Sequence, residues 1–328
     1  MRMVRPRLTL LLLSVSIAAC GGTPATSASK QIDVGVITTS PINQGTYDPA
    51  HYAAYSKVFA QYGWHLKLAE AVPYGQGPQT FDRFGSQGLP YVFVTDNGEA
   101  QAMLDAAKKY PNTKFIMMSD IDSTQGLPNV TAYTFNWYEI GYIAGVESAL
   151  ASKTHVIGGI SGQPIPAALK VFGGARFGAD QAVPGTTLKI QYVNDWADAA
   201  KAREVAGALL GQKADVLFGL LAGMESAVAQ AVAAGNAQYI GWLVDESKLY
   251  PVTTASVTVN FLSQYEAAAK MLSSGHFDAS IHRGTIEGGI ITYVPFNGSN
   301  ASYDGTLQQF VNKVKSGQLT VPSQGATQ

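Results

Sequence analysis

Short apolar runs alternate with amphipathic stretches along most of this chain, and this alternation restricts the possible folds more than any other feature. The apolar runs have the length of strands and occupy residues 32–37, 91–95, 114–118, 156–160, 188–193, 216–220 and 239–244. Helical periodicity lies between them, at residues 99–110, 137–152, 167–181, 199–210 and 224–234. Strands that are apolar on both faces and separated by helices predict a parallel sheet covered on each side. We therefore expect an α/β protein.

The strand candidates are too numerous for one comfortable sheet, so we expect two similar lobes with a cleft between them. The first series of strands and helices ends near residues 130–137, and further crossings are expected near 257–261 and near Glu287. Lobe 1 is expected to comprise 31–134 and 258–285, and lobe 2 135–257 and 286–328. Open parallel sheets bind ligands at the carboxyl ends of their strands. The loops predicted to face the cleft are 38–48, 95–99, 119–124, 161–166, 194–198, 221–225 and 245–247.

The charge balance argues against a nucleic acid partner. The 328 residues include 22 Lys and Arg against 23 Asp and Glu, a formal net charge of -1. The isoelectric point is near 6.5, and no basic run follows the first residues. Binding to a phosphate backbone requires a clustered positive surface.

The first residues have the pattern of an export signal. Arg2, Arg5 and Arg7 precede an apolar stretch, residues 8–15, that is too short to span a bilayer. Cys20, the only cysteine, follows in a segment that resembles a bacterial lipobox (IAACG, residues 17–21). We expect residues 1–19 to be a lipoprotein signal peptide and 20–30 a flexible tether, so that lipid on Cys20 holds the protein on the extracytoplasmic side of a bacterial membrane. An ordinary signal peptide with an incidental cysteine is the alternative.

Several stretches together resemble the basic membrane protein family, the lipoprotein subunits that bind purine nucleosides and related ligands for bacterial ABC importers. The matching stretches are residues 45–54 (GTYDPAHYAA), 135–149 (FNWYEIGYIAGVESA), 158–178 (GGISGQPIPAALKVFGGARFG), 196–206 (WADAAKAREVA), 214–218 and 240–245. The resemblance implies a type I periplasmic-binding-protein fold, with two doubly wound αβ lobes joined by a three-strand hinge. It also implies permease subunits as partners and a monomeric receptor.

The resemblance also implies ligand-binding residues in both lobes. Tyr47 resembles the aromatic residue that stacks on the base, and Asp48 stands where the family usually has Asn. Phe172 and Trp196 are the candidate aromatic residues of lobe 2. Gly223 and Asp245 resemble the glycine-bearing loop and the ligand-binding Asp of the family.

Two departures from the family pattern bear on the ligand. For an Asp that follows the strand ending at Met118, Asp120 is the nearest candidate, although a gapless match falls on Ser119. A Lys that reaches the ribose in many members is replaced here by Val259 or Asn260. The expected ligand is therefore a purine nucleoside or a free nucleobase.

Each candidate also has an ordinary structural explanation. Tyr47 could pack at a helix edge, and Asp48 before Pro49 could initiate a helix. Phe172 could belong to a core helix face, Trp196 could be buried under the following helix, and Asp245 could occupy a solvated turn. Trp242, inside an apolar strand, is expected to be a core residue.

Catalytic patterns are weak, and we expect neither an enzyme nor a cofactor. The five histidines show no metal-binding spacing, and the glycines at 158–162 lack the Lys and Ser or Thr of a phosphate loop. An extracytoplasmic substrate-binding lipoprotein is the favoured function. A sensor or receptor of the same fold for a sugar or another small heterocycle, such as a flavin-like molecule, is the alternative.

Overall fold

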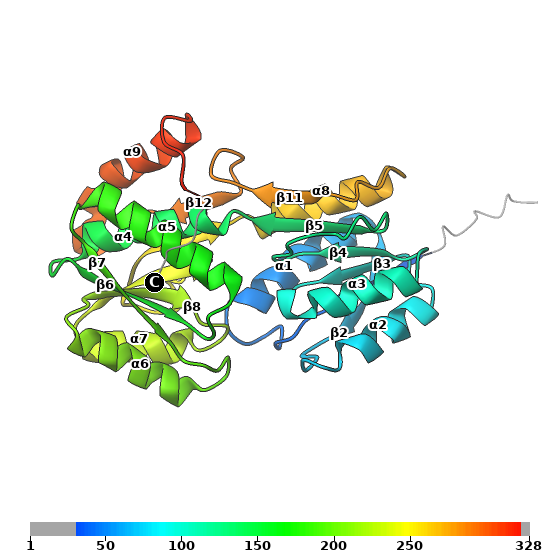
Figure 1. The fold of residues 1–328 in the computed structure, drawn as a ribbon, viewed down its shortest axis with the longest axis horizontal. Helices are drawn as coiled ribbons and strands as arrows, with labels where there is room; N and C mark the ends of the chain where they lie inside the picture. The colour runs from blue at the N-terminus through cyan, green and yellow to red at the C-terminus, as the bar shows by residue number, and fades with distance from the viewer. Residues whose placement is uncertain (1–30, 323–328) are drawn as a thin grey trace, which may run out of the picture. The chain divides into compact units, whose positions relative to one another are not determined.

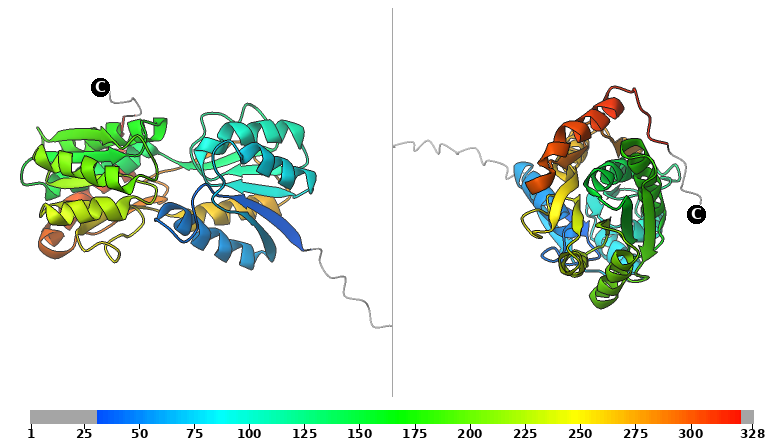
Figure 2. Two further views of the ribbon diagram at one scale, coloured as in Figure 1. Left: turned by 90° about the horizontal axis from the view of Figure 1, so that it is seen from below. Right: turned by 90° about the vertical axis from the view of Figure 1, so that its left-hand side faces the viewer.

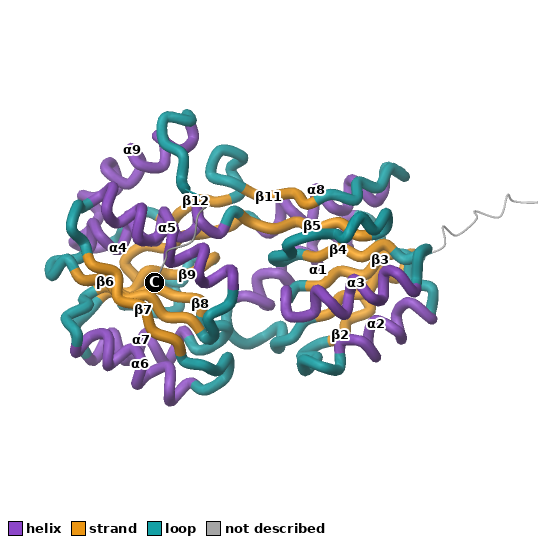
Figure 3. Tube along the Cα trace, viewed as in Figure 1, coloured by secondary structure: helices purple, strands orange, loops and turns teal. Residues whose placement is uncertain are grey.

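The computed structural model describes residues 31–322 and contains two six-stranded sheets with helices on both faces of each (Figures 1 and 3). The predicted signal peptide, Cys20 and the predicted tether lie outside the described residues. No helix within 31–322 is long and apolar enough to cross a membrane.

The first sheet has the strand order β11-β5-β4-β3-β1-β2, and all of its strand pairs are parallel. Helices α1 and α8 pack together on one face, and α2 and α3 on the other. We call this unit lobe 1. Its elements are β1 (Ile32–Ile37), α1 (Tyr47–Gln61), β2 (Trp64–Ala69), α2 (Gly77–Ser86), β3 (Tyr91–Val94), α3 (Ala100–Lys109), β4 (Lys114–Met117), β5 (Val130–Phe135), α8 (Phe261–Ser273) and β11 (Ile281–Gly284).

The second sheet has the order β12-β10-β9-β8-β6-β7, in which only the edge pair β10–β12 is antiparallel. Helices α4 and α5 cover one face and α6 and α7 the other (Figure 2). We call this unit lobe 2. Its elements are α4 (Trp137–Ala151), β6 (Val156–Ser161), α5 (Pro166–Ala182), β7 (Thr187–Tyr192), α6 (Ala199–Gly211), β8 (Val216–Leu220), α7 (Glu225–Ala234), β9 (Gln238–Leu243), β10 (Thr253–Val259), β12 (Ile291–Val294) and α9 (Asp304–Lys315).

The two sheets repeat one doubly wound topology. In each, the first strand lies between the second and the third, and the fourth and fifth follow outward. The order reverses beside the first strand, and this reversal places the ligand site of such sheets at the carboxyl ends of the central strands. The predicted fold class is confirmed.

Three segments join the lobes and are hydrogen-bonded to one another. The chain passes from β5 to α4 at Asn136, from β10 to α8 at Asn260, and from β11 to β12 through residues 285–290. The Asn136 N–H donates to the Gly284 carbonyl at 2.9 Å, and the Asn260 N–H donates to the Ile290 carbonyl at 2.8 Å. The three crossings therefore act as one hinge.

Helices α4 and α5 approach closely because each presents glycine to the other. A Cβ atom at Gly141 or Gly145 of α4 would lie 2.0 or 2.1 Å from the carbonyl oxygen of Val171 or Ala175 of α5. In the same way, a Cβ atom at Gly174 or Gly178 of α5 would lie 2.0 or 2.2 Å from the carbonyl oxygen of Tyr138 or Tyr142 of α4. Any side chain at these positions would force the helices apart.

The predicted strands and helices are present, with ends that shift by a few residues. Strand β2 was not predicted, because its sequence WHLKLA alternates polar and apolar residues at the edge of the sheet. The short strands β11 and β12 were also not predicted, since each has only four residues and lies at a sheet edge.

Candidate ligand-binding site

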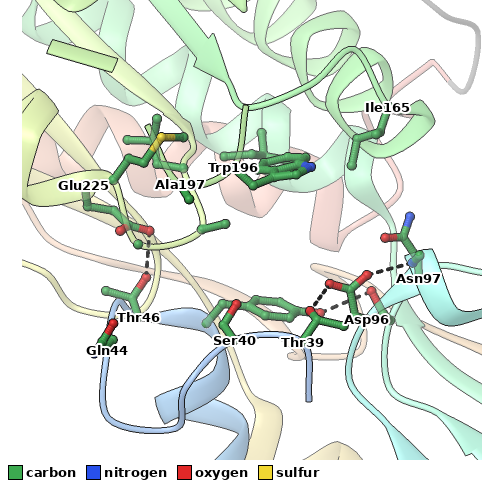
Figure 4. A pocket seen from close by; sticks show the side chains of 18 of the residues that line it. Thr39, Ser40, Gln44, Thr46, Asp96, Asn97, Ile165, Trp196, Ala197 and Glu225 are labelled. Carbon is green, nitrogen blue, oxygen red and sulfur yellow. Dashed lines mark hydrogen bonds between the residues drawn. The ribbon is translucent and has the colours of Figure 1, made fainter. Parts of the chain in front are cut away.

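A cavity of about 760 Å³ lies at the carboxyl ends of the strands and receives residues from both lobes (Figure 4). Lobe 1 contributes the segments after β1, β2, β3 and β4, and lobe 2 contributes the start of α4, the segments after β6, β7 and β8, and the end of β9. The size falls within the range of small-molecule sites, roughly 300–1,000 Å³. Of the predicted cleft loops, only 245–247 contributes no lining residue.

Tyr47, the first residue of α1, lines the cavity in a fixed orientation. Its hydroxyl donates to the Thr95 carbonyl at 2.9 Å and lies 3.2 Å from Ser119 Oγ. The rings of His51 and Phe261 contact it edge-on, with centroid distances of 4.6 and 6.0 Å. Burial raises the pKa of the Tyr47 hydroxyl, so the group remains a neutral donor at physiological pH.

Trp196 lines the cavity from lobe 2, on the short segment between β7 and α6. Asp195 holds this segment, since its Oδ1 accepts hydrogen bonds from the N–H groups of Ala197 and Asp198 at 2.6 and 3.1 Å. The indole ring lies against bare backbone, because a Cβ at Gly162 would be 2.1 Å from its Cε3. The ring is half-buried and lines the cavity. Asp198 caps α6 by accepting from the Lys201 N–H.

Two carboxylates line the cavity, one in each lobe. Asp96, after β3, accepts hydrogen bonds from Thr39 Oγ1 at 2.5 Å, from the Tyr74 hydroxyl at 2.9 Å and from the Gly98 N–H at 2.7 Å. Glu225, the first residue of α7, is 1% exposed and accepts from Thr46 Oγ1 at 3.2 Å through Oε1 (Figure 4). Its Oε2 has no hydrogen-bond partner within the described chain.

The rest of the lining is largely apolar, and one of its polar atoms is buried without a partner in the described chain. Trp137, Trp242 and Met224 are among the lining residues. The indole Nε1–H of Trp137 is buried and has no partner within residues 31–322. The described lining includes no Lys, Arg or His. The cavity therefore has hydrogen-bond acceptors and donors, and no cationic side chain is among its described lining residues.

Gly223 shapes one end of the cavity. Its φ of +106° is readily available only to glycine, and a Cβ at Gly45 of lobe 1 would lie 2.9 Å from its Cα. The loops containing Gly45 and Gly223 thus touch directly next to the Thr46–Glu225 hydrogen bond. The structure places Tyr47, Trp196 and Gly223 of the predicted residues around the cavity.

Asp48 and Asp120 do not line the cavity, because protein groups occupy their carboxylates. Asp48 accepts from the Ser40 N–H at 3.0 Å and from Thr95 Oγ1 at 2.7 Å, which ties the start of α1 to β1 and β3. Burial raises its pKa to about 6. It lies in the first turn of α1 and is not the N-cap, which is Thr46. Asp120 pairs with Lys170 and Arg283, and its neighbour Ser119 lines the cavity instead.

Phe172, Asp245 and Asn260 also lie outside the cavity. Phe172 is 1% exposed and packs against Phe218 and Tyr192 in the core of lobe 2. Asp245 is exposed and accepts from the backbone N–H and the hydroxyl of Ser247, as a turn residue does. Asn260 caps α8 by accepting from the Ser263 N–H. In each case the ordinary structural explanation describes the observed contacts.

The lining residues that were not singled out as candidates from the sequence include Asp96, Trp137, Thr46 and Glu225. Asp96, Thr46 and Glu225 fall inside loops that the strand pattern had already placed at the cleft, so their polar character was the available signal. Trp242 was predicted to be a core residue. It is buried, but it lies near the carboxyl end of β9 and lines the cavity as well.

The described residues contain no group of three or more His, Cys, Asp or Glu side chains that could hold a metal ion. What the arrangement offers is a binding site with aromatic faces, hydrogen-bond acceptors and, at Trp137, a buried donor without a partner in the described chain.

Comparisons with known proteins are consistent with this geometry. A family model described as "ABC transporter substrate-binding protein PnrA-like" (Bmp) matches residues 31–324. A purine-binding protein of Brucella abortus is 24% identical over 301 residues, which are 90% of this chain and 84% of that protein. A Haloferax volcanii protein, whose name describes an ABC transporter glucose-binding protein, is 28% identical over 198 residues. That match covers 60% of this chain and about half, 49%, of the relative.

A solved solute-binding protein of an ABC transporter system from Aeropyrum pernix has the same fold. Its TM-score is 0.78 at 15% sequence identity, and the match covers 89% of this chain and 94% of that one.

Proposed function

Because the chain belongs to the Bmp family of PnrA-like ABC transporter substrate-binding proteins, we propose that it captures a purine base or purine nucleoside in its cavity and delivers it to a membrane permease. Tyr47 and Trp196 hold the flat ring system, one from each lobe. Polar groups at the cavity ends then select among heterocycles.

Two aromatic side chains from different lobes line the same cavity, and this arrangement is the main support for the proposal. Each aromatic contact contributes roughly 0.5–1.5 kcal/mol beyond the burial of area. Because the two rings belong to different lobes, a ligand that contacts both is held best when the lobes close on it. Binding and hinge motion are then coupled, as delivery to a permease requires.

The charge of the lining supports an uncharged ligand. Asp96 and Glu225 line the cavity, and no cationic side chain is among its described lining residues. A phosphate group would lose its hydration without gaining a positive partner. Bases and nucleosides fit this environment, whereas nucleotides do not.

Cys20 is the proposed site of lipid attachment. It follows the export signal in a lipobox-like segment, and attachment there would hold the receptor at the membrane beside its permease. Labelled fatty acid should be incorporated into the chain when it is expressed in bacteria. Labelling that persists in Cys20→Ser would refute the site.

The test of the ligand is direct. The purified protein is denatured and the released small molecules are identified by mass spectrometry. Calorimetry then follows with adenine, guanine, xanthine, adenosine, guanosine, glucose and ribose. We expect at least one purine to bind at micromolar concentration or below. Failure of all five purines below millimolar concentration would refute the purine proposal.

A sugar is the second candidate. It is supported by the name of the Haloferax volcanii relative, and aromatic faces with carboxylate acceptors also suit a sugar. Tight binding of glucose or ribose, with no purine bound, would select it.

A further inference from the structure

Glu225 and Glu246 are two buried glutamates of lobe 2, and Glu225 lines the cavity. Glu225 is 1% exposed and Glu246 is 0% exposed. Glu246 accepts a hydrogen bond from the Trp242 backbone N–H at 3.3 Å through Oε2, while its Oε1 has no partner within the described residues. Neither glutamate makes an ion pair within residues 31–322.

Two neighbouring buried carboxyl groups without a cation do not both ionise near neutral pH. Burial, and then the charge of Glu225, raise the pKa of Glu246 to about 9. The other titratable groups that face the pair are Tyr239 and Tyr250, whose pKa values burial also raises, so both stay neutral. Glu246 therefore retains a proton, and Glu225 is the acid that lines the cavity.

The orientation of Glu225 is set from the opposite lobe. The Thr46 hydroxyl occupies Oε1, which leaves Oε2 as the free acceptor. An acceptor that is almost fully buried and unpaired has lost its hydration without gaining a hydrogen bond, and a ligand donor removes that cost. Asp96 differs, because protein donors already occupy both of its oxygens.

We propose that Glu225 is the specificity-determining acceptor of this cavity, which takes an N–H group of the ligand on Oε2, with Thr46 as its positioning residue. This proposal rests on the proposed function and makes it more specific. The ligand is then a purine with a free N–H donor, and a derivative in which that donor is alkylated is rejected. A site built around a buried polar group discriminates strongly, because a ligand that lacks the complementary group leaves it unpaired.

The test is calorimetry on the full chain with adenine, which has both a ring N–H and an amino group, with 9-methyladenine, which lacks the ring N–H, and with N6,N6-dimethyladenine, which lacks the amino N–H donors. We expect the wild-type protein to bind adenine at least tenfold more tightly than one of the two methylated forms. Glu225→Gln should lose most of that preference. Thr46→Val, which keeps the side-chain shape, should reduce the preference to a smaller degree and provides a test if Glu225→Gln does not fold. Glu204→Gln, an exposed acid on α6, is the matched control and should behave as wild type.

The outcomes separate the two proposals. If the wild-type protein prefers adenine but both variants retain its preference and affinity within about twofold, Glu225 is not the selecting acceptor, and the purine function stands. An equal loss of affinity for all three ligands in Glu225→Gln also overturns donor recognition. If the wild-type protein binds no purine in either panel, the proposed function fails and this inference fails with it.

Discussion

Lys170 of lobe 2 forms an ion pair with Asp120 of lobe 1, with Nζ 2.8 Å from Oδ2. Arg283 of β11 lies farther from the same carboxylate, with Nη1 3.6 Å from Oδ1. Asp120 follows β4 and Lys170 lies in α5, so the pair links the lobes outside the three hinge segments. The resemblance placed Asp120 among the ligand-binding residues, whereas its contacts here are those of a connection between lobes.

Replacing Lys170 should therefore destabilise the protein. In Lys170→Met the carboxylate of Asp120 stays buried and retains the longer contact with Arg283 and a hydrogen bond from Thr134 Oγ1 at 3.4 Å. We expect a loss of about 1–3 kcal/mol in urea denaturation, less than the roughly 3–5 kcal/mol for a fully buried pair, because Lys170 is 24% exposed. Asp120→Asn should restore part of the loss in the double variant. The exposed Lys201→Met is the control, and equal stability of Lys170→Met and wild type would contradict the account.

Trp196→Ala should weaken ligand binding with little effect on folding. The ring is half-buried and lines the cavity, so its removal takes away a stacking face for the ligand. We expect purine affinity to fall by at least about threefold in calorimetry, since an aromatic contact contributes roughly 0.5–1.5 kcal/mol beyond area. Trp64→Phe in the core of lobe 1 is the control and should keep its affinity. Unchanged binding in Trp196→Ala would remove Trp196 from the site.

Phe172→Ala should destabilise the protein and leave ligand binding almost unchanged, which is the reverse of the effects expected for Trp196→Ala. Phe172 is a core residue of lobe 2, and truncating such a ring leaves a cavity that costs about 3–5 kcal/mol. We expect the free energy of unfolding to fall by that amount. Ligand affinity, measured at low temperature where the variant remains folded, should stay within about twofold of wild type. A large affinity loss at full stability would return Phe172 to the ligand site.

Glu246→Gln should reduce the loss of stability that accompanies rising pH. The pKa of Glu246 in the folded protein, about 9, is above the ordinary value of 4.5. Between these values the folded state binds more protons than the unfolded state, so this group makes stability fall as pH rises. A neutral amide removes that dependence. Thermal unfolding at pH 5, 6.5 and 8 measures the effect. The unfolding temperature of Glu246→Gln should rise relative to that of wild type as pH rises, whereas Glu204→Gln should show the same pH dependence as wild type. A constant difference between variant and wild type would contradict the assignment.

The same substitution, glycine to alanine, should have opposite effects on two helices of lobe 2. A Cβ at Gly145 would lie 2.1 Å from the Ala175 carbonyl oxygen, so Gly145→Ala forces α4 away from α5, at a cost of about 1–3 kcal/mol. A Cβ atom at Gly207 in α6 would have no neighbouring atom within 4 Å outside its own helix turn. Gly207→Ala should therefore stabilise the protein by up to about 1 kcal/mol through helix propensity. Urea denaturation of both variants tests the close approach of the helices, and a stabilised Gly145→Ala would refute it.

The fold could be predicted from the sequence because central strands buried on both faces leave a clear apolar pattern. Strand β8, VLFGL, is fully buried and was predicted at its observed bounds. Strand β2 has polar residues on one face and left no such pattern. The position of the cavity followed from the same reasoning, because carboxyl ends of parallel strands meet at one edge.

Which side chain of a loop faces the cavity could not be predicted, because it depends on single backbone dihedrals. Asp245 and Glu246 are neighbours, and the sequence favoured the first as a ligand acceptor. In the structure Asp245 turns outward to Ser247 and Glu246 turns inward, just after Leu243 adopts a φ of +62°. Helical periodicity likewise could not show whether Phe172 faces the core or the cavity. Eight residues of α5 are buried, so the apolar pattern predicts burial but not which neighbours bury the ring.

Three of the four tryptophans in the chain, Trp137, Trp196 and Trp242, line the cavity. The fourth, Trp64, packs against Phe59 within lobe 1, with ring centroids 5.4 Å apart. Most of the indole side chains of this protein therefore lie at the proposed ligand site, and Trp64 adds a background emission from outside the cavity lining. The unlabelled protein is its own fluorescent reporter of occupancy, and ligands can be screened by the intensity and wavelength of its emission alone.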